Sequence, residues 1–434
     1  MKLTPYWWDA APRPENDPPS LPARSDVVIV GAGYTGLTAA ITLARAGLSV
    51  AVLDRLRPGE GASSRNGGIC SGNLKLSFSE LIKKFGLEHA KSLFQEGINA
   101  RLALAELITS ENIDCDYDHS GRFTGANLEK NYDGLGFEAD LMNKHLDLGV
   151  EMVKKPDQHQ HIGTDFYQGG QVRKDIYGLH PGKFVNGLYD RAREAGAEIL
   201  FPVSVKSIKR GASGFCINTD TGDIRANHVV VATNGYTTHA TPWFNRRIIP
   251  IPSQIIATEP LPPETMARLM PGHHMYSDTR NLYNYYRPSP DGMRIIFGGR
   301  RGADTHDPKQ KTRHLKNNLK EIFPELKDVA ITHSWHGFTG YSFDMMPHLT
   351  THKGVHYVGA FCGSGVVWAP WVGKMAARNI LKTAGLDQGT YPESHFSTAS
   401  FPTRPLYFGK PWFLPLVIKW YGIKDLLGKG RHSG

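Results

Sequence analysis

The chain has 434 residues, 40% of them hydrophobic and 21% charged, a composition typical of a folded globular protein and not of a disordered or fibrous one. No apolar run approaches the roughly 18 residues of a membrane span, the N-terminal stretch lacks the hydrophobic region of a secretory signal, and the four cysteines have no metal-ligand spacing. We therefore expect a cytoplasmic protein without a metal site. Its formal net charge of +9 suits an anionic substrate, an anionic membrane surface or nucleic acid, and equally an ordinary solvated surface with an excess of Lys and Arg, so the charge alone does not decide.

The first predicted elements form a βαβ unit over residues 26–54. A buried strand (DVVIVG) is followed by a helix (TGLTAAITLARAG) and a second strand (LSVAVLDR). Gly31, Gly33 and Gly36 span the junction of the first strand and the helix, where they allow a tight turn, close approach to a pyrophosphate and close helix packing. Asp54 ends the second strand, in position to bind ribose hydroxyls. The unit therefore predicts a dinucleotide site.

The later elements divide between two predicted domains. A helical stretch covers about residues 78–108, residues 178–236 resemble a further part of a nucleotide-binding fold, and residues 246–302 are rich in β-strand patterns. A helix is expected over 308–323, and the last strand is followed by another helix. We predict an α/β fold in which a Rossmann-like nucleotide-binding domain is interleaved with a substrate domain built on a mostly antiparallel sheet. The nucleotide-binding domain comprises 1–80, 175–245 and 333–400, the substrate domain 81–174 and 246–332, and the tail 401–434.

The two ends of the chain have unusual compositions. Residues 1–25 are rich in proline and are expected to form an extended arm. In residues 405–427, Trp, Tyr, Phe and Leu alternate with lysines, which is typical of a segment at a membrane interface. A tail packed on its own domain is the alternative, and both interpretations stay open.

A second loop of small residues decides between cofactors. Residues 61–68, GASSRNGG, follow closely on Asp54. An NAD enzyme does not need such a loop, whereas the longer diphosphate and ribityl chain of FAD require a second set of close backbone contacts. The sequence therefore favours FAD.

These motifs together resemble the D-amino-acid oxidase (DAO)-type superfamily of FAD-dependent amine and amino-acid oxidoreductases. The resemblance continues in GLHPGKFVNGLYDRAREAGAEI, VVVATNGYT, WHGFTGYSFDMMPHL and GAFCGSGVVWAP, and spans roughly residues 25–385. Within the superfamily, the pattern is most similar to the branch that contains γ-glutamylputrescine oxidoreductase and the sarcosine and pipecolate oxidases.

The resemblance implies a set of FAD-binding residues: Gly31, Gly33, Tyr34, Thr35, Gly36, Asp54, Arg55, Gly61, Ala62, Ser63, Ser64, Arg65, Asn66, Gly67, Gly68, Val205, Thr233, Asn234, Gly235, Gly363, Ser364, Gly365 and Val366. The last four would begin a helix whose N-terminus stabilises negative charge on reduced flavin. The segment GFTGYSFDMM has no cysteine where the sarcosine oxidase branch attaches its flavin, so FAD is expected to be non-covalent. Two carboxylate anchors of the family are also missing, since Val367 and Thr339 stand in their places.

The substrate must then be held by other side chains. Tyr283, Tyr285 and Arg287 share one face of a predicted strand, where a guanidinium beside phenols suits a carboxylate. The alternative is that they pack the sheet and cap a hairpin. Arg300 and Arg301 are further substrate-binding candidates, with solvent exposure as their alternative. We expect catalytic roles for Tyr285, Arg287 and His336, although a lone histidine such as His336 is often structural.

The resemblance implies oxidation of the C–N bond of a secondary amine or amino acid, such as an imino acid, an N-substituted glycine or a γ-glutamylputrescine-like compound. Hydride transfer to flavin N5 would give an imine, and hydrolysis would release an aldehyde or oxo acid and an amine. Two electron acceptors stay open. One is oxygen, and the other is a quinone, which would be reduced by a dehydrogenase that docks through residues 405–427 on the inner face of the membrane. A nucleic-acid-modifying flavoenzyme is a remote alternative, motivated by net charge alone.

Overall fold

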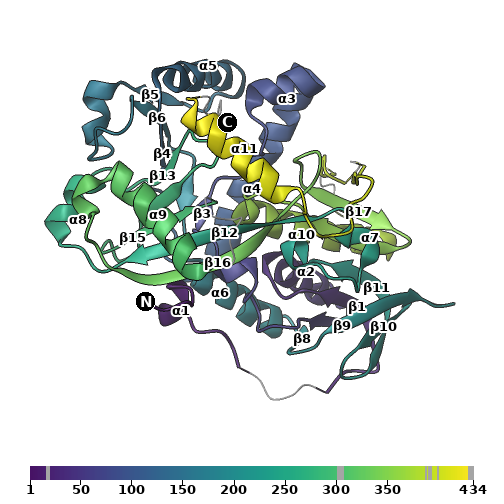
Figure 1. Ribbon diagram of the computed structural model, residues 1–434. Helices are drawn as coiled ribbons and strands as arrows, with labels where there is room; N and C mark the ends of the chain where they lie inside the picture. The colour runs from purple at the N-terminus through teal and green to yellow at the C-terminus, as the bar shows by residue number, and fades with distance from the viewer. Residues whose placement is uncertain (16–19, 301–306, 387–388, 390–392, 398–399, 429–434) are drawn as a thin grey trace.

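Two large β-sheets organise the computed structural model, which describes residues 1–15, 20–300, 307–386, 389, 393–397 and 400–428 (Figure 1). The first sheet has the strand order β17–β18–β11–β1–β2–β8. The five neighbouring strands from β18 to β8 are parallel to one another. Their bounds are β1 (Arg24–Val30), β2 (Val50–Leu53), β8 (Glu198–Leu200), β11 (Asp223–Val231) and β18 (Val355–Gly359). Three antiparallel strands complete the sheet: β9 (Val205–Arg210), β10 (Phe215–Thr219) and β17 (His348–His352).

Helices cover one face of this sheet, as a parallel arrangement requires. Alternate residues of β1 enter different cores: Val27 and Ile29 pack with the helices, and Val28 packs with the antiparallel strands β9 and β10. This explains why the DVVIVG run is continuously apolar. The helices of the first core are α2 (Tyr34–Arg45), α3 (Phe78–Phe85), α4 (Leu87–Ser110), α6 (Pro181–Glu194) and α10 (Gly365–Thr383).

The second sheet has the order β16–β12–β15–β14–β13–β4–β6–β5 and is antiparallel except for the parallel pair β4–β13. Its strands are β4 (Arg122–Gly125), β5 (Glu151–Val153), β6 (Gly170–Arg173), β12 (Ile249–Thr258), β13 (Met275–Asp278), β14 (Tyr285–Pro288), β15 (Ile295–Gly299) and β16 (Ile331–Tyr341). Beside it lie α5 (Glu129–Leu146), α8 (Pro263–Leu269) and α9 (Pro308–Ile322), and a short ladder pairs β3 (Ile69–Cys70) with β7 (Tyr177–Gly178). The smaller elements are α7 (Pro242–Asn245) and the 3₁₀ turns η1 (Ala62–Ser64), η2 (Lys155–Gln160), η3 (Asn234–Tyr236) and η4 (Pro324–Leu326).

The expected α/β fold with a mostly antiparallel second sheet is confirmed, but the domain boundaries shift. The nucleotide-binding domain was expected to resume at residue 333, yet β16 (Ile331–Tyr341) pairs with β12 in the second sheet. Within the segment 81–174, α4 packs in the core of the first sheet, against α10. Burial of the apolar face of α4 therefore places this helix with the nucleotide-binding domain.

The N-terminal arm is also different from its prediction. It contains a short helix, α1 (Trp7–Ala10), and Trp7 is fully buried against Ile255 and Trp335 of the second sheet. A Pro-rich composition predicted an extended arm, but two adjacent tryptophans supply enough apolar surface to fix the segment against the protein.

The C-terminal segment forms α11 (Leu414–Leu426), the yellow helix that crosses the front of the molecule in Figure 1. Its inner side packs through Leu414 and Ile418 on Leu282, and the Asp425 carboxylate accepts hydrogen bonds from the backbone and side-chain N–H groups of Asn281. The segment 405–427 is thus partly packed on its own chain. Among the described helices, none combines the length and apolar character that crossing a membrane requires.

Candidate cofactor and substrate site

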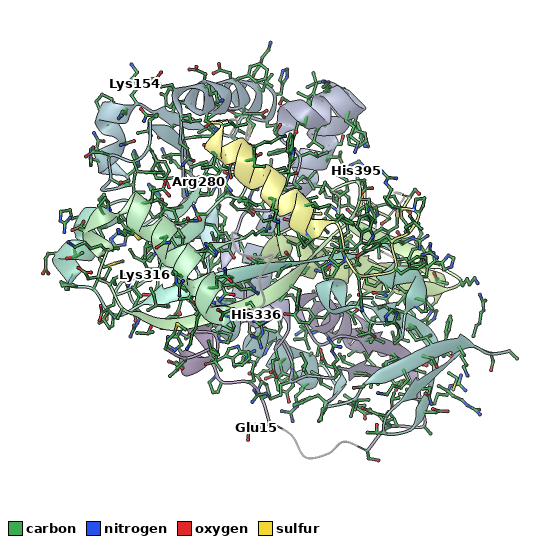
Figure 2. All side chains as sticks on the ribbon, in the orientation of Figure 1. Glu15, Lys154, Arg280, Lys316, His336 and His395 are labelled. Carbon is green, nitrogen blue, oxygen red and sulfur yellow. The ribbon has the colours of Figure 1, made fainter. Side chains whose placement is uncertain are left out.

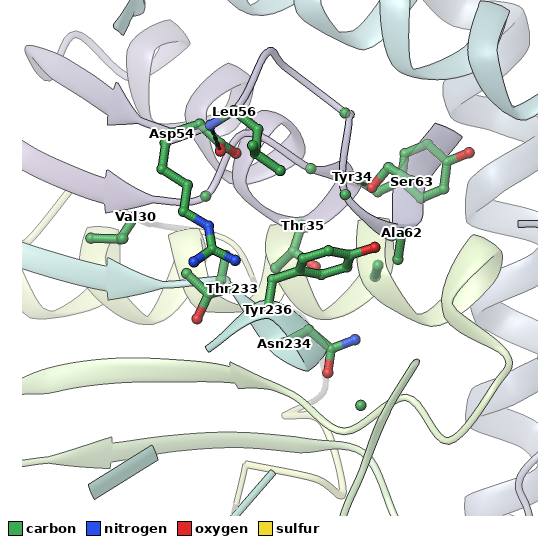
Figure 3. A pocket seen from close by; sticks show the side chains of 18 of the residues that line it. Val30, Tyr34, Thr35, Asp54, Leu56, Ala62, Ser63, Thr233, Asn234 and Tyr236 are labelled. Carbon is green, nitrogen blue, oxygen red and sulfur yellow. Dashed lines mark hydrogen bonds between the residues drawn. The ribbon is translucent and has the colours of Figure 1, made fainter. Parts of the chain in front are cut away.

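A cavity of about 460 Å³ lies at the carboxyl ends of β1, β2 and β11 (Figure 3). Sixteen of the residues predicted to bind FAD line it: Gly31, Gly33, Tyr34, Thr35, Asp54, Arg55, Gly61, Ala62, Ser63, Asn66, Val205, Thr233, Asn234, Gly363, Gly365 and Val366. The cavity therefore brings together loops that are more than 300 residues apart in the chain.

The glycines give this cavity the form of a phosphate cradle. Helix α2 begins at Tyr34, whose N–H donates to the Ser63 hydroxyl at 3.0 Å, and Gly33 at the N-cap provides no side-chain cap, so the next backbone N–H groups of the first turn can face a ligand. A Cβ at Gly33 would lie 2.8 Å from the Ser63 hydroxyl, and a Cβ at Gly36 would lie 1.9 Å from the carbonyl oxygen of Gly31. A larger residue at either position would fill the cradle or separate the helix from the strand.

Asp54 supports the nucleotide end of the cavity. Its Oδ2 accepts a hydrogen bond from the Ala32 N–H at 2.7 Å, and its Oδ1 accepts one from the Leu56 N–H at 2.9 Å. Burial raises the pKa of Asp54 to about 6, opposed by these two backbone N–H groups. Each carboxylate oxygen keeps a second lone pair, which suits hydrogen bonds from the two hydroxyls of a ribose. The residues present therefore fit the ADP half of FAD.

Two buried indoles hold the second glycine loop. Nε1 of Trp7 donates a hydrogen bond to the Asn66 carbonyl, and Nε1 of Trp335 donates one to the Arg65 carbonyl, both at 2.9 Å. The tryptophans come from the N-terminal helix and from β16, so two segments that are far apart in the chain fix one loop. Sequence reasoning missed this role of Trp7, because an indole partner 59 residues away leaves no local signal.

The remaining predicted cofactor residues lie behind the cavity or beside it. Gly36, Ser64, Gly68 and Gly235 do not line either the cofactor cavity or its neighbours; Arg65 and Gly67 line the adjoining cavity described next, and Ser364 lines a third. A Cβ at Gly68 would lie 2.1 Å from the Leu179 carbonyl oxygen, so this glycine permits close packing. The prediction also missed lining residues that continue the VVVATNGYT motif and the β16 strand: Tyr236, Thr238, His239, Thr241, Thr339 and Gly340.

An adjoining cavity of about 140 Å³ shares Ala62, Asn66, Thr339, Gly363 and Val366 with the cofactor cavity. It extends from there toward the second sheet, between the loop of residues 61–68 and the loop at Gly363. Its other walls include three predicted substrate or catalytic residues and one that was not predicted: Tyr283, Tyr285, Arg300 and Arg122. We call it the reaction chamber.

The phenols and Arg300 form one cluster in the reaction chamber. The Tyr285 hydroxyl lies 2.9 Å from the Ser253 hydroxyl, and burial raises the pKa of Tyr285 to about 12, so the phenol is neutral at physiological pH. The Arg300 guanidinium lies 5.1 Å from the centroids of the Tyr283 and Tyr341 rings, and its Nη2 is 3.4 Å from the Tyr283 hydroxyl. The chamber thus presents a cation framed by aromatic rings.

Arg287 and His336, both expected to be catalytic, are placed elsewhere. Nη1 of Arg287 donates hydrogen bonds to the carbonyls of Gly68 at 3.2 Å and Leu179 at 2.9 Å, so this guanidinium braces the second glycine loop and lines none of the three cavities. His336 is exposed on β16 and lines none of them (Figure 2). Arg301 lies outside the described residues.

Residues 26–379 match the model of the DAO family, described as FAD dependent oxidoreductase. The chain is 31% identical over 427 residues to the probable oxidoreductase OrdL of Rhizobium meliloti, covering 97% of each chain. It is 28% identical over 408 residues to γ-glutamylputrescine oxidoreductase of Escherichia coli, covering 93% of each. The crystal structure of glycine oxidase from Geobacillus kaustophilus has the same fold, with a TM-score of 0.70 at 18% identity over 87% of this chain and 99% of that one.

Proposed function

The chain belongs to the DAO family of FAD-dependent oxidoreductases, and on that premise we propose that it oxidises the C–N bond of a secondary amine or amino acid that carries a carboxylate. The residues that line the cofactor cavity would hold FAD without a covalent bond, and bound FAD would supply the acceptor for a hydride that leaves the carbon beside the amine nitrogen. The nitrogen lone pair then forms the C=N bond, water hydrolyses this imine to an aldehyde or oxo acid and a smaller amine, and oxygen or a quinone takes up the electrons.

The residues of the reaction chamber have binding and orienting roles in this reaction. Arg300 attracts the substrate carboxylate, and Tyr283 supports the guanidinium. The neutral Tyr285 phenol and the apolar side chains of Ile255 and Phe338 form walls that exclude water and favour the uncharged amine. No proton-transfer group is required at the reacting carbon, since the amine itself supplies the electron pair.

The observation that carries the proposal is an arginine-lined chamber that opens directly on the cofactor cavity. Anaerobic titration of the FAD-loaded protein with matched amines tests it: N-methylglycine, 4-(methylamino)butanoate, pipecolate, γ-glutamylputrescine, and dimethylamine as the amine without a carboxylate. We expect at least one carboxylate-bearing amine to bleach the flavin absorbance far faster than dimethylamine. Absence of bleaching by every amine, or faster bleaching by dimethylamine, would refute the proposal.

A second candidate function is a membrane-bound dehydrogenase that reduces a quinone, and the outer face of α11 favours it. Leu416, Trp420, Ile423 and Leu427 recur at helical spacing opposite the packed side, with 66, 57, 48 and 64% of their surface exposed. Residues 404–428 contain four Lys or Arg and one acid, Asp425, which is bonded inward. Apolar and aromatic residues flanked by cations suit an anionic lipid surface on the cytoplasmic side of a membrane.

Two measurements separate the dehydrogenase from the oxidase. Flotation with vesicles of phosphatidylglycerol and phosphatidylcholine should retain the protein and lose the variant Trp420→Ser/Ile423→Ser, while pure phosphatidylcholine should bind less. Stopped-flow reoxidation of the substrate-reduced protein should be faster with a water-soluble quinone than with oxygen. Rapid reoxidation by oxygen with no vesicle binding would leave the oxidase as the function.

A further inference from the structure

Arg122 carries a positive charge in the substrate cavities and forms no direct ion pair with an acid among the described residues. The residue lies on β4, and its side chain lines both the reaction chamber and a third cavity of about 100 Å³. Its Nε is buried without a hydrogen-bond partner among the described residues. Burial, aided by the neighbouring charge of Arg173, lowers the pKa of Arg122 to about 10, so the group remains charged at neutral pH. Burying such a cation lowers the stability of the protein unless a ligand supplies the missing hydrogen-bond acceptors and negative charge.

The nearby acids are already engaged. Asp175 pairs with both Arg101 and Arg173, whose guanidinium nitrogens bond its carboxylate. Asp278 accepts hydrogen bonds from the backbone and side-chain N–H groups of Asn284, at 3.0 and 2.7 Å, and lies 3.6 Å from the Arg280 guanidinium. Both acids are thus bonded directly to other groups, and Asp175 acts on Arg122 only through its charge at longer range.

The third cavity borders the cofactor cavity less than the reaction chamber does. It shares Gly363 alone with the lining of the cofactor cavity, whereas the reaction chamber shares five residues with it. Its walls are polar and include Ser277, Thr124 and Gln171, and Nζ of Lys75 at its edge lies 5.2 Å from the centroid of the Tyr283 ring. We call it the distal chamber. Arg122 stands where the reaction and distal chambers meet.

We propose that Arg122 and the distal chamber bind a carboxylate that is separated from the reacting nitrogen by several carbon atoms. The preferred substrates are then ω-carboxylated amines, in which the carboxylate lies at the far end of the chain, and N-substituted α-amino acids without a distal anion are poorer substrates. This assignment rests on the proposed function, because it takes the reaction chamber as the place where the amine is oxidised.

The assignment follows from the positions of the two cavity arginines. Arg300 lies beside the loop at Gly363, which lines the cofactor cavity, since a Cβ at Gly363 would be 3.0 Å from Nη2 of Arg300. A carboxylate on Arg300 therefore lies beside this loop, whereas Arg122 also faces the distal chamber and can hold a carboxylate there. A guanidinium binds a carboxylate through two parallel hydrogen bonds, a geometry that lysine cannot reproduce.

Steady-state kinetics of the FAD-loaded Arg122→Gln variant test the proposal with 4-(methylamino)butanoate and N-methylglycine. We expect KM for the long substrate to rise at least tenfold with kcat within threefold, and KM for N-methylglycine to change less than threefold. Arg122→Lys should recover part of the loss. The matched control is Lys174→Gln, which removes an exposed charge just beyond the neighbouring strand β6, and it should match the parent protein.

Binding of thioethers separates failure of the subsite from failure of the proposed function. In 4-(methylthio)butanoate and (methylthio)acetate, sulfur replaces the reacting nitrogen, and flavin absorbance reports their dissociation constants. The longer thioether should bind more tightly to the parent protein and lose at least tenfold in Arg122→Gln. If the thioethers bind in this way but no amine reduces the flavin, the subsite is supported and the proposed amine oxidation is refuted. Equal loss for both lengths, or no loss in a folded, FAD-loaded Arg122→Gln, would overturn the subsite and leave the oxidation intact.

Discussion

The two indole hydrogen bonds to the second glycine loop are expected to control affinity for FAD. Trp7 and Trp335 are 0 and 1% exposed, so their N–H groups and the carbonyls that accept from them are shielded from water. Replacing either by Phe leaves a buried carbonyl unpaired, at a cost of about 1–3 kcal/mol. In the protein without FAD the loop can shift and hydrate that carbonyl, so much of the cost appears when the cofactor binds.

The expected result is a rise of about tenfold in the dissociation constant of FAD for Trp7→Phe or Trp335→Phe, since tenfold corresponds to about 1.4 kcal/mol. Fluorescence quenching of FAD by the apoprotein measures this constant, and urea unfolding measures the stability of the same samples. Trp371→Phe is the control, because it removes an indole N–H that donates to Glu96 at 2.9 Å outside the cofactor cavity.

The control should lose stability and keep its FAD affinity within twofold. If Trp7→Phe and Trp335→Phe behave in the same way as the control, the indoles only pack the protein. The argument that they hold the loop in its binding conformation would then be refuted.

Three further substitutions test the cofactor cradle, the buried His180 at the start of α6, and the reaction chamber. Gly36→Ala should abolish FAD binding and lower the melting temperature of the protein, because its Cβ would overlap the Gly31 carbonyl; retention of FAD would contradict the cradle geometry. Burial lowers the pKa of His180 from 6.5 to about 4, so the unfolded state binds the extra proton, and His180 should remove about 3 kcal/mol of stability as the pH falls from 6.5 to 4. His180→Asn, which keeps an N-cap acceptor for α6, should flatten that part of the urea-unfolding profile, and an unchanged profile would assign the loss to other groups. Tyr283→Phe removes the hydroxyl beside Arg300 and should raise KM for carboxylated amines about threefold to tenfold in steady-state assays, with little effect on dimethylamine; equal effects on both would contradict a role in carboxylate binding.

The cofactor cradle could be predicted because its determinants are local. The spacing of Gly31, Gly33 and Gly36, with a strand before and a helix after, sets the backbone geometry within one βαβ unit. Asp54 follows at the end of the next strand, and its distance along the chain fixes its place in space. The structure adds the supporting contacts but does not move these residues.

The face of the strand around Tyr285 could also be predicted, although its neighbours could not. A Cβ at Gly67 would lie 3.0 Å from the Tyr285 ring, and one at Gly68 would lie 2.9 Å from Nη1 of Arg287. The two side chains therefore face the same loop, as alternation along a strand requires. Alternation does not say which end of that face meets the cavity, and Arg287 falls on the end that meets backbone carbonyls.

The position of Arg122 depends on pairing between β4 and β13, whose paired residues are 153 positions apart, and no local pattern reports this pairing. In the parallel register of β4 and β13, Phe123 lies opposite Tyr276 and both pack in the second core, while Arg122 and Thr124 face the distal chamber. A shift of this register by one residue would turn Phe123 toward the cavity and Arg122 into the core. The apolar side chains of the core oppose that shift, because it would bury an unpaired guanidinium among aromatic rings. The same packing that stabilises the second sheet thus fixes the charge that the proposed carboxylate subsite requires.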